Sequence, residues 1–373
     1  MKSLLPLLQI ELNFVDYKIA LLCFITAFVV AMVSIPPVIM LVHKYRLLDI
    51  PGDRKEHLIP TPTLGGIAIM AGMTVSLSFW FPGGLSGDVM TCFFAIAVLF
   101  GMGITDDLKD LSAKYKFVVE IALAALIALS GIRITTFGGL FGLNEIPISA
   151  QYTFTILAIV GITNAFNLID GIDGLAGGLS FMSLVTLGLF LTISGDKSFA
   201  LIAFALAGGV LAFLYFNMNP AKIFMGDTGS LVLGFVIALL CTRLIQVNSL
   251  AAQPILKSAP LFALGMVFIP VFDTMRVFAL RIWKGKSPFD PDKTHIHHLL
   301  TNAGVSHSLT SKIMCVIHGF ILIEVYWLKE FKPEFILCML MAAMILVTYL
   351  FYNIHWLKRK TNINTKPTEY ELS

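Results

Sequence analysis

The sequence predicts an all-α, polytopic integral membrane protein, and three observations lead to that fold class. Hydrophobic residues make up 57% of the 373-residue chain and charged residues only 13%, about half of the charged share in soluble domains. Apolar runs of about 20 residues recur along the chain, and each can cross a hydrocarbon core roughly 30 Å thick. The runs are too long and unbroken for barrel strands, so helices remain as the spanning structure.

These runs predict about eleven membrane-spanning helices, which we assign to a single transmembrane domain covering residues 1–373. The expected spans, in chain order, are 19–42, 64–81, 89–104, 117–131, 152–168, 176–194, 198–216, 229–246, 258–280, 311–328 and 335–355. Because Pro270 falls inside the ninth span, we expect a bent or broken helix there.

The basic residues predict the orientation of the helices. About 17 of the 26 Lys and Arg residues fall on one side, and the positive-inside rule makes that side cytoplasmic. The loops on this side are 43–63, 105–116, 168–175, 217–228 and 281–310, followed by the tail 356–373. Most of the conspicuous Asp, Asn and His residues also lie there, whereas a pump or channel more often carries ionisable groups at mid-span. We therefore expect an active-site cleft that faces the cytoplasm and joins a soluble substrate to a lipid.

The motif TDD at the end of the third span contains Asp106 and Asp107. Adjacent carboxylates repel each other, so a proton or a cation is usually needed to hold both. Mg²⁺ suits such hard oxygen ligands and commonly bridges phosphates. A solvated loop rich in acids and lysines is the alternative interpretation.

The stretch NAFNLIDGIDGLAGG follows the fifth span. Four polar residues recur in it at intervals of three: Asn164, Asn167, Asp170 and Asp173. On a helix this spacing drifts slowly around one face, and the glycines allow close approach of a ligand to the backbone. A hydrogen-bonded seam between helices, followed by a glycine turn, is an equally good interpretation of this stretch alone.

Two further motifs complete the cytoplasmic set. In FNMNPAKIFMGDTGS, Asn219 marks a turn and Asp227 precedes the eighth span, where it could ligate a metal or serve as the helix N-cap. In PFDPDKTHIHHLL, three histidines cluster: His295, His297 and His298. They could bind an anionic phosphate or Zn²⁺, or lie on the surface without a role. The net charge of +3 is too small to indicate nucleic-acid binding.

Taken together and in this order, the motifs resemble the polyprenyl-phosphate N-acetylhexosamine-1-phosphate transferases (glycosyltransferase family 4). The resemblance runs from TPTLGG (61–66) through TDD (105–107), NAFNLIDGIDGLAGG and FMGDTGS to HIHHLL (295–300). The HIHH version of the last motif and the eleven spans resemble the WecA/TagO-type undecaprenyl-phosphate GlcNAc-1-phosphate transferases.

This resemblance implies a reaction and a place in the cell. An oxygen of undecaprenyl phosphate attacks a UDP-N-acetylhexosamine, most simply UDP-GlcNAc, and gives a polyprenyl-diphosphate-sugar and UMP. The family implies Mg²⁺, for which Mn²⁺ substitutes, the bacterial cytoplasmic (inner) membrane, and often a homodimer. The first membrane step of cell-envelope polysaccharide synthesis, such as lipopolysaccharide O-antigen, is the implied context.

The resemblance also implies roles for individual residues. It places the catalytic groups at Asp106, Asp107, Asp170, Asp173, His295, His297 and His298, with Asp227 and Asp107 at the metal. It places the substrate-binding groups at Asn164, Asn167, Gly174, Leu175, Phe224, Lys109, Lys116 and Asn219. Within the second set, Gly174 and Leu175 are expected to approach uracil, Phe224 to stack on it, and the two lysines to neutralise phosphate.

Several alternatives remain open at this point. The same chemistry could act on UDP-GalNAc or UDP-MurNAc-pentapeptide, and an aspartyl-phosphate intermediate could replace direct attack. A cation-coupled transporter would need polar residues at depth, and a zinc hydrolase would depend on HIHH.

Overall fold

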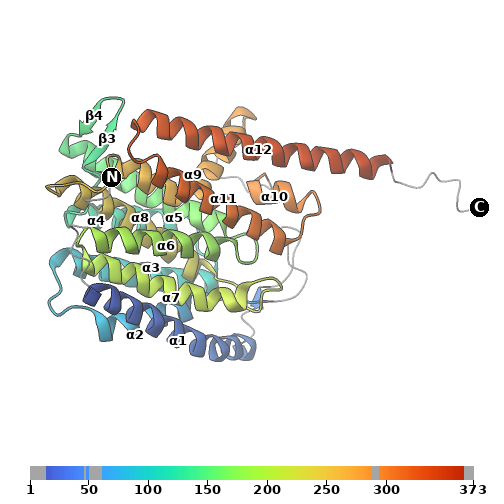
Figure 1. Cartoon of the computed structure of the whole chain (residues 1–373). Coiled ribbons are helices and arrows are strands. Elements are labelled where there is room, and N and C mark those ends of the chain that lie inside the picture. The colour runs from blue at the N-terminus through green and yellow to red at the C-terminus, as the bar shows by residue number, and fades with distance from the viewer. Residues whose placement is uncertain (1–13, 46–47, 50–60, 288–293, 365–373) are drawn as a thin grey trace, which may run out of the picture.

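The computed structural model describes residues 14–45, 48–49, 61–287 and 294–364, and its folded part is a bundle of long helices that run side by side (Figure 1). The helices are α1 (Phe14–Tyr45), α2 (Gly65–Trp80), α3 (Gly87–Lys109), α4 (Ala113–Leu129), α5 (Ile148–Ile169), α6 (Leu175–Ile193), α7 (Lys197–Asn217), α8 (Asp227–Leu250), α9 (Ala259–Trp283), α10 (Ile296–Thr301), α11 (His307–Trp327) and α12 (Pro333–Asn364). Parts of the predicted loops 43–63 and 281–310 and of the tail 356–373 lie outside the described residues.

The predicted fold class is confirmed, because each of the eleven predicted spans overlaps one helix and the described strands are few. Nine helices within the described residues are long and apolar enough to cross a membrane. The other two, α2 and α4, have 16 and 17 residues, and at 1.5 Å per residue each is shorter than a hydrocarbon core. The number of crossings therefore stays a prediction.

The strands form two small antiparallel pairs. One joins β1 (Leu48–Asp49) to β2 (Thr61–Pro62), and the other joins β3 (Thr136–Leu140) to β4 (Leu143–Glu145). The β3–β4 hairpin lies at the end of the bundle opposite to α10 (Figure 1).

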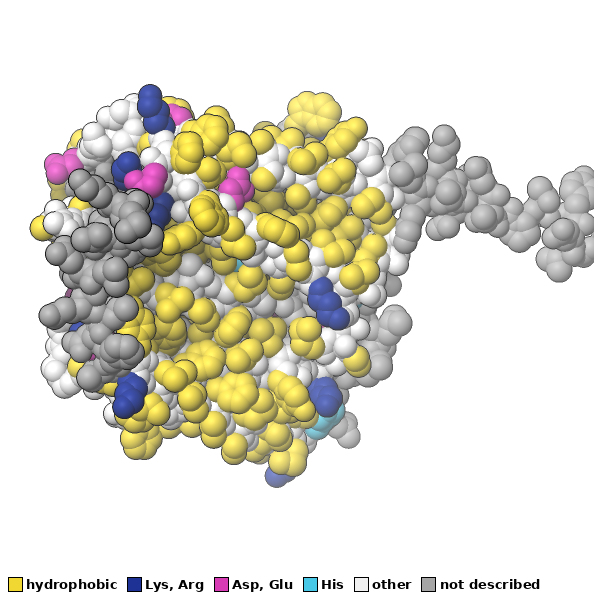
Figure 2. Space-filling view, in the orientation of Figure 1, with side chains coloured by type: hydrophobic (Ala, Val, Ile, Leu, Met, Phe, Trp, Pro, Cys, Tyr) yellow, Lys and Arg dark blue, Asp and Glu magenta, His cyan; other side chains and the backbone are white. Residues whose placement is uncertain are grey.

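The helix α8 forms the centre of the bundle. It packs against α2, α3, α5, α6, α7 and α9, and all but a few of its side chains are buried. The visible outer face is dominated by hydrophobic side chains (Figure 2). Many hydrophobic side chains of the bundle are strongly exposed, among them Val33, Phe320 and Leu346. An apolar exterior around an apolar core is what a bundle surrounded by lipid requires.

Glycines bring α2 and α3 into backbone contact with the start of α8. A Cβ on Gly66 would lie 2.4 Å from the amide nitrogen of Gly229, and one on Gly103 would lie 2.6 Å from the Cα atom of Thr228. Small residues at helix crossings allow this approach, which is typical of packing within membranes. The C-terminal end of α3 is thereby held against the N-terminal end of α8.

The helix is not broken at Pro270, since α9 continues through this residue to Trp283, and the expected bend at this position stays a prediction. Pro270 is buried, and proline is tolerated inside membrane helices where neighbouring helices pack against it.

Candidate active site

Several helix ends converge around one polar cleft of about 770 Å³. The C-terminal ends of α3, α5 and α7 and the N-terminal ends of α4 and α8 bring polar groups to it, and α10 and the start of α11 each add a histidine. The lining residues are Thr63, Asp106, Asp107, Asp110, Lys116, Asn167, Asp170, Gly171, Ile172, Asp173, Asn217, Phe224, Gly226, Asp227, Ser230, His298 and His307.

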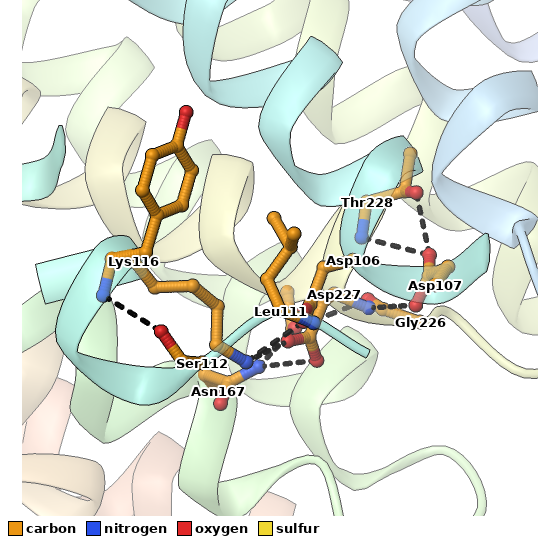
Figure 3. Close-up of polar contacts among 11 residues, drawn as sticks. Asp106, Asp107, Leu111, Ser112, Lys116, Asn167, Gly226, Asp227 and Thr228 are labelled. Atoms are coloured by element: carbon orange, nitrogen blue, oxygen red, sulfur yellow. Dashed lines mark hydrogen bonds and ion pairs between the residues drawn. The ribbon is translucent and has the colours of Figure 1, made fainter. Parts of the chain in front are cut away.

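Lys116 links two carboxylates from different helices at the centre of the cleft (Figure 3). Its Nζ atom lies 2.7 Å from Oδ2 of Asp106 on α3 and 2.9 Å from Oδ2 of Asp227 on α8. The Asp106 carboxylate also accepts a hydrogen bond from the amide of Leu111 at 2.7 Å. One cation thus balances two acids, and the cluster keeps a net negative charge that favours binding of another cation.

Asn167 fixes the other side of Asp227. Its side-chain nitrogen donates to Oδ1 of Asp227 and to Oγ of Ser230, both at 2.9 Å. Because Ser230 lies one turn into α8, the amide spans the first turn of that helix. Both carboxylate oxygens of Asp227 are therefore oriented by side chains from α4 and α5.

Asp107 has a different set of partners from its neighbour Asp106. Its carboxylate accepts hydrogen bonds from the amides of Asp227 and Thr228, at 2.8 and 3.0 Å, and from the Thr228 hydroxyl at 2.5 Å. The N-cap position of α8 is Gly226, so the interpretation of Asp227 as the N-cap is wrong. The cap of α8 comes from α3.

The loop between α5 and α6 carries Asp170 and Asp173. Burial, together with the nearby charges of Asp227, Asp107 and Asp173, raises the pKa of Asp170 to about 7. Oδ2 of Asp173 accepts hydrogen bonds from the side chain of Asn219 at 2.8 Å and from the amide of Ala221 at 3.1 Å. The loop is therefore tied to the segment that leads into α8.

Gly174 and Asn217 complete this tie. Gly174 has a left-handed backbone with a φ of 77°, a conformation that suits glycine, and its amide donates to Oδ1 of Asn217 at 2.8 Å. The side-chain nitrogen of Asn217 donates to the carbonyl of Ile223, also at 2.8 Å. One asparagine thus joins both loops of the cleft.

The three histidines divide into different environments. His298 lines the cleft, and the centroids of the His297 and His298 rings are 4.3 Å apart. His297 is buried against the loop between α5 and α6 (the IDGIDG loop, residues 169–174). A Cβ on Gly171 in this loop would lie 2.8 Å from Nε2 of His297. His295 is buried behind them, with Nδ1 2.9 Å from Oδ2 of Asp273 on α9.

Asp273 anchors the histidine segment. Besides His295, it accepts the amide of Ile296 at 3.0 Å and Nη2 of Arg276 at 2.8 Å. Arg276 also donates to the carbonyl of Thr294. A completely buried carboxylate with three donors holds the start of α10 in place, and the sequence analysis did not find it because Asp273 lies inside an apolar span.

The predicted residues fall into two groups. Those that line the cleft are Asp106, Asp107, Asp170, Asp173, His298, Asn167, Phe224, Lys116 and Asp227. Those outside the lining are His295, His297, Asn164, Gly174, Leu175, Lys109 and Asn219.

Three residues of the second group lie away from the predicted positions. The Leu175 side chain is fully buried in the core, so the expected contact of this side chain with uracil is not supported. Asn164 faces the buried Glu120 on α4 and donates to its carboxylate. Lys109 is exposed at the end of α3, and of the two predicted phosphate-binding lysines only Lys116 faces the cleft.

Within the described residues, no group of three or more His, Cys, Asp or Glu side chains is arranged as a metal site. Asp106 and Asp227 nevertheless provide two carboxylates on either side of one cation. Mg²⁺ is usually held by one or two carboxylates and completed by water and substrate phosphates, so these two residues fit it.

The fold and the cleft define a class of protein, namely a multi-pass membrane protein with an acidic site at one end of its helix bundle. Residues 89–245 match the model of glycosyl transferase family 4. This range includes TDD, NAFNLIDGIDGLAGG and FMGDTGS, so the match covers the centre of the cleft but not the histidine segment.

Curated relatives extend the similarity beyond that range. The chain is 35% identical over 313 residues to the probable undecaprenyl-phosphate N-acetylglucosaminyl 1-phosphate transferase of Bacillus subtilis (strain 168), covering 80% of this chain and 82% of the relative. It is 33% identical to the undecaprenyl-phosphate alpha-N-acetylglucosaminyl 1-phosphate transferase of Yersinia pestis, covering 83% and 84% of the two chains. The same-named protein of Escherichia coli (strain K12) is 31% identical, with 80% and 81% covered. The chain therefore belongs to glycosyl transferase family 4.

Proposed function

We propose that this protein transfers GlcNAc-1-phosphate from UDP-GlcNAc to undecaprenyl phosphate. The relatives' names support this reaction, and one observation in the structure carries it: carboxylates from α3 and α8 meet around Lys116 in a single cleft. A site of this kind can hold a diphosphate beside a lipid headgroup.

In the proposed step, an oxygen of the lipid phosphate forms a bond to the sugar-bearing phosphorus of UDP-GlcNAc. The bond from that phosphorus to the oxygen bridging the two phosphates breaks, and UMP leaves with the bonding electrons. Phosphoryl transfer of this kind depends mainly on positioning and on neutralising charge. The lipid phosphate is already largely anionic, because the second pKa of a phosphate monoester is about 6, so no strong base is required.

The residues of the cleft then have distinct tasks. Lys116 neutralises phosphate oxygens, Asn167 keeps Asp227 oriented, and Asp106 orients the attacking phosphate or takes up its remaining proton. We propose Mg²⁺, or Mn²⁺ in its place, as the cofactor held by Asp227 and Asp106. When bound, such an ion draws negative charge from the phosphate oxygens.

The nucleotide is proposed to bind on the side of the IDGIDG loop. Asp170, Asp173 and Phe224 line the same cleft, and the aromatic ring of Phe224 can stack on the base. His298 can donate a hydrogen bond to the diphosphate. His295 and His297, which were predicted to be catalytic, are proposed instead to support the ring of His298.

The location of the protein also has an established part and a proposed part. The protein is a multi-pass membrane protein, and we propose that it resides in the bacterial inner membrane with the cleft toward the cytoplasm. The excess of Lys and Arg in the predicted loops that carry TDD, NAFNLIDGIDGLAGG and FMGDTGS and in the other predicted loops of that side supports this orientation. A homodimer and a role in the first membrane step of cell-envelope polysaccharide synthesis are further proposals from the family.

The decisive experiment measures release of UMP from purified, detergent-solubilised protein supplied with undecaprenyl phosphate, Mg²⁺ and one UDP-sugar at a time. UDP-GlcNAc should give the fastest release, and UDP-GalNAc and UDP-MurNAc-pentapeptide should be poor substrates. Preference for another sugar would move the proposal to that substrate, and no release with any of them would reject it.

Two controls separate the remaining alternatives. Chelation should stop release, and Mg²⁺ or Mn²⁺ should restore it; restoration by Zn²⁺ alone would favour the hydrolase interpretation. With UDP-GlcNAc made chiral at its sugar-bearing phosphorus, direct attack should invert the configuration at that atom. Net retention of configuration would instead require the aspartyl-phosphate intermediate.

A further inference from the structure

The contact between the end of α3 and the start of α8 carries an inference beyond the reaction itself. Asp107 and Thr228 face each other across this contact (Figure 3). Both oxygens of Asp107 are occupied by α8: Oδ1 accepts the amide of Asp227, and Oδ2 accepts the amide and the hydroxyl of Thr228.

The start of α8 needs an acceptor from elsewhere. The first amides of a helix have no partner within the helix and are normally capped by a side chain at the N-cap. Here the N-cap is Gly226, which has no side chain, and the carboxylate of Asp227 is directed to Lys116 and Asn167. Asp107 supplies the missing acceptor, and its negative charge lies at the positive end of the α8 dipole.

The surroundings of Asp107 are shaped for this contact. A Cβ on Gly226 would lie 2.5 Å from Oδ2 of Asp107, so only glycine leaves room for the carboxylate. Gly103, one turn earlier on α3, lets that helix touch the backbone of Thr228. Two glycines from separate motifs therefore allow one carboxylate to reach one helix end.

We propose that Asp107 and Thr228 are positioning residues: together they fix the first turn of α8, so that the Asp227 carboxylate stays oriented into the cleft. The proposal deepens the function above and rests on it for its kinetic consequences. Asp107 then acts through Asp227, rather than as a nucleophile or as a principal ligand of the metal, because three of its roughly four acceptor positions are filled by α8.

Thr228 makes the proposal testable, because it is completely buried and lies outside the cleft lining. The Thr228→Val variant removes its hydroxyl without a change of shape and touches no substrate. A hydrogen bond to a charged group is lost, so we expect a fall in kcat of about 10-fold. The concentration of Mg²⁺ at half-maximal rate should rise, while the KM for undecaprenyl phosphate should stay unchanged.

Two matched variants serve as controls. Thr228→Ser keeps the hydroxyl and should restore kcat and the Mg²⁺ dependence. Thr242→Val makes the same substitution at a buried position of the same helix, where the hydroxyl bonds only to the carbonyl of Ala238, and should leave both unchanged. Wild-type kinetics in Thr228→Val, or equal losses in Thr228→Val and Thr242→Val, would overturn the proposal.

A second readout needs no substrate. Thermal unfolding of Asp107→Ala, Thr228→Val and the double variant forms a double-mutant cycle. We expect the double variant to be no less stable than Asp107→Ala alone, because both changes remove the same contact between the carboxylate and the Thr228 hydroxyl. Additive losses of stability would overturn the contact itself.

A separate test asks whether Asp107 acts through Asp227 and not directly in the reaction. Asp107→Asn should retain at least 10 times the activity of Asp227→Asn, whereas equal loss in both would assign Asp107 a direct chemical role and overturn the proposal. If the wild-type protein releases no UMP at all, the proposed function fails, and the unfolding cycle still decides whether the contact exists.

Discussion

The helices α3 and α8 carry an acidic cluster at each end, and the two clusters are built differently. At the end away from the cleft, Arg243 pairs with Asp196 at 2.6 Å and with Asp88 at 3.4 Å, and it lies over the ring of Phe199. At the cleft, Lys116 is shared by Asp106 and Asp227, with four further aspartates in the same lining: Asp107, Asp110, Asp170 and Asp173.

The difference concerns the direction of the helix dipoles as well as the number of charges. Asp88 lies in the first turn of α3 and Asp196 is the N-cap of α7, where the dipole favours an anion. At the cleft the effects are mixed: Asp106 lies at the C-terminal end of α3, where the dipole opposes its charge, whereas Asp107 and Asp227 lie at the start of α8, where the dipole favours theirs. One end of the helix pair therefore serves stability, whereas the other retains negative charge that a metal ion and its bound phosphates can use.

The largest test of this comparison replaces one acid at each end. Asp227→Ala should lower kcat/KM by about 100- to 1000-fold, since it removes a preorganised charged group from the reacting centre. Asp88→Ala should keep turnover within a factor of about 2, because Asp88 lies at the other end of the bundle and makes only a long, partly exposed ion pair with Arg243. UMP release by both variants, normalised to folded protein, provides the measurement, and a normal rate in Asp227→Ala would remove the assigned site.

Arg243→Met tests the stabilising end. The change leaves Asp196 without its charged partner in a largely buried setting, so the free energy of unfolding should fall by about 2 kcal/mol. Turnover of the protein that remains folded should not change. Lys257→Met is the control, because the Lys257–Glu330 pair is exposed at the surface and should contribute little. Similar unfolding temperatures in both variants would show that the cluster is not stabilising.

Gly171→Ala sharpens the comparison at the histidine wall of the cleft. The added Cβ would overlap Nε2 of His297, so the ring must shift and displace its neighbour His298. We expect kcat/KM for UDP-GlcNAc to fall about 10-fold, with the KM for the lipid unchanged. Gly161→Ala, where a Cβ meets open space, is the control. Unchanged kinetics in Gly171→Ala would mean that the histidines are not placed by this contact.

The smallest expected effect concerns pH and Asp170. Because its pKa is raised from 3.8 to about 7, the folded protein keeps a proton here that the unfolded chain loses between these values. The associated stabilisation is present below about pH 4 and disappears as the pH rises through 7. Without metal, Asp170→Asn should therefore unfold about 2 °C higher than the wild type at pH 8 and gain less at pH 5. An equal gain at both pH values would contradict the shifted pKa.

Several features of the cleft could be predicted from the sequence. Asp106, Asp107 and Asp227 each follow or precede an apolar span on the same side, so helix ends had to bring them to one surface of the membrane. The spacing of Asn164 and Asn167 was less informative. Three residues turn a helix by about 300° rather than a full circle, and this offset directs Asn167 to Asp227 but Asn164 to Glu120.

Other features depend on contacts between distant segments. Nothing in TDD distinguishes Asp106 from Asp107, yet only Asp107 reaches the amides of α8. Asp273 was missed because a single acid inside an apolar span carries no periodic signal. The fully buried side chain of Leu175 belongs to the core, since packing against other helices decides which side of a helix start faces a ligand.

The sequence by itself determined the helical membrane fold and the side on which the polar residues gather, because hydropathy and chain length leave no other way to satisfy the backbone in lipid. The tertiary structure alone decided which carboxylate faces the cleft and which caps a helix. That choice depends on the rotation of each helix and on the glycine contacts between α3 and α8, which are set by packing over a separation of more than 100 residues.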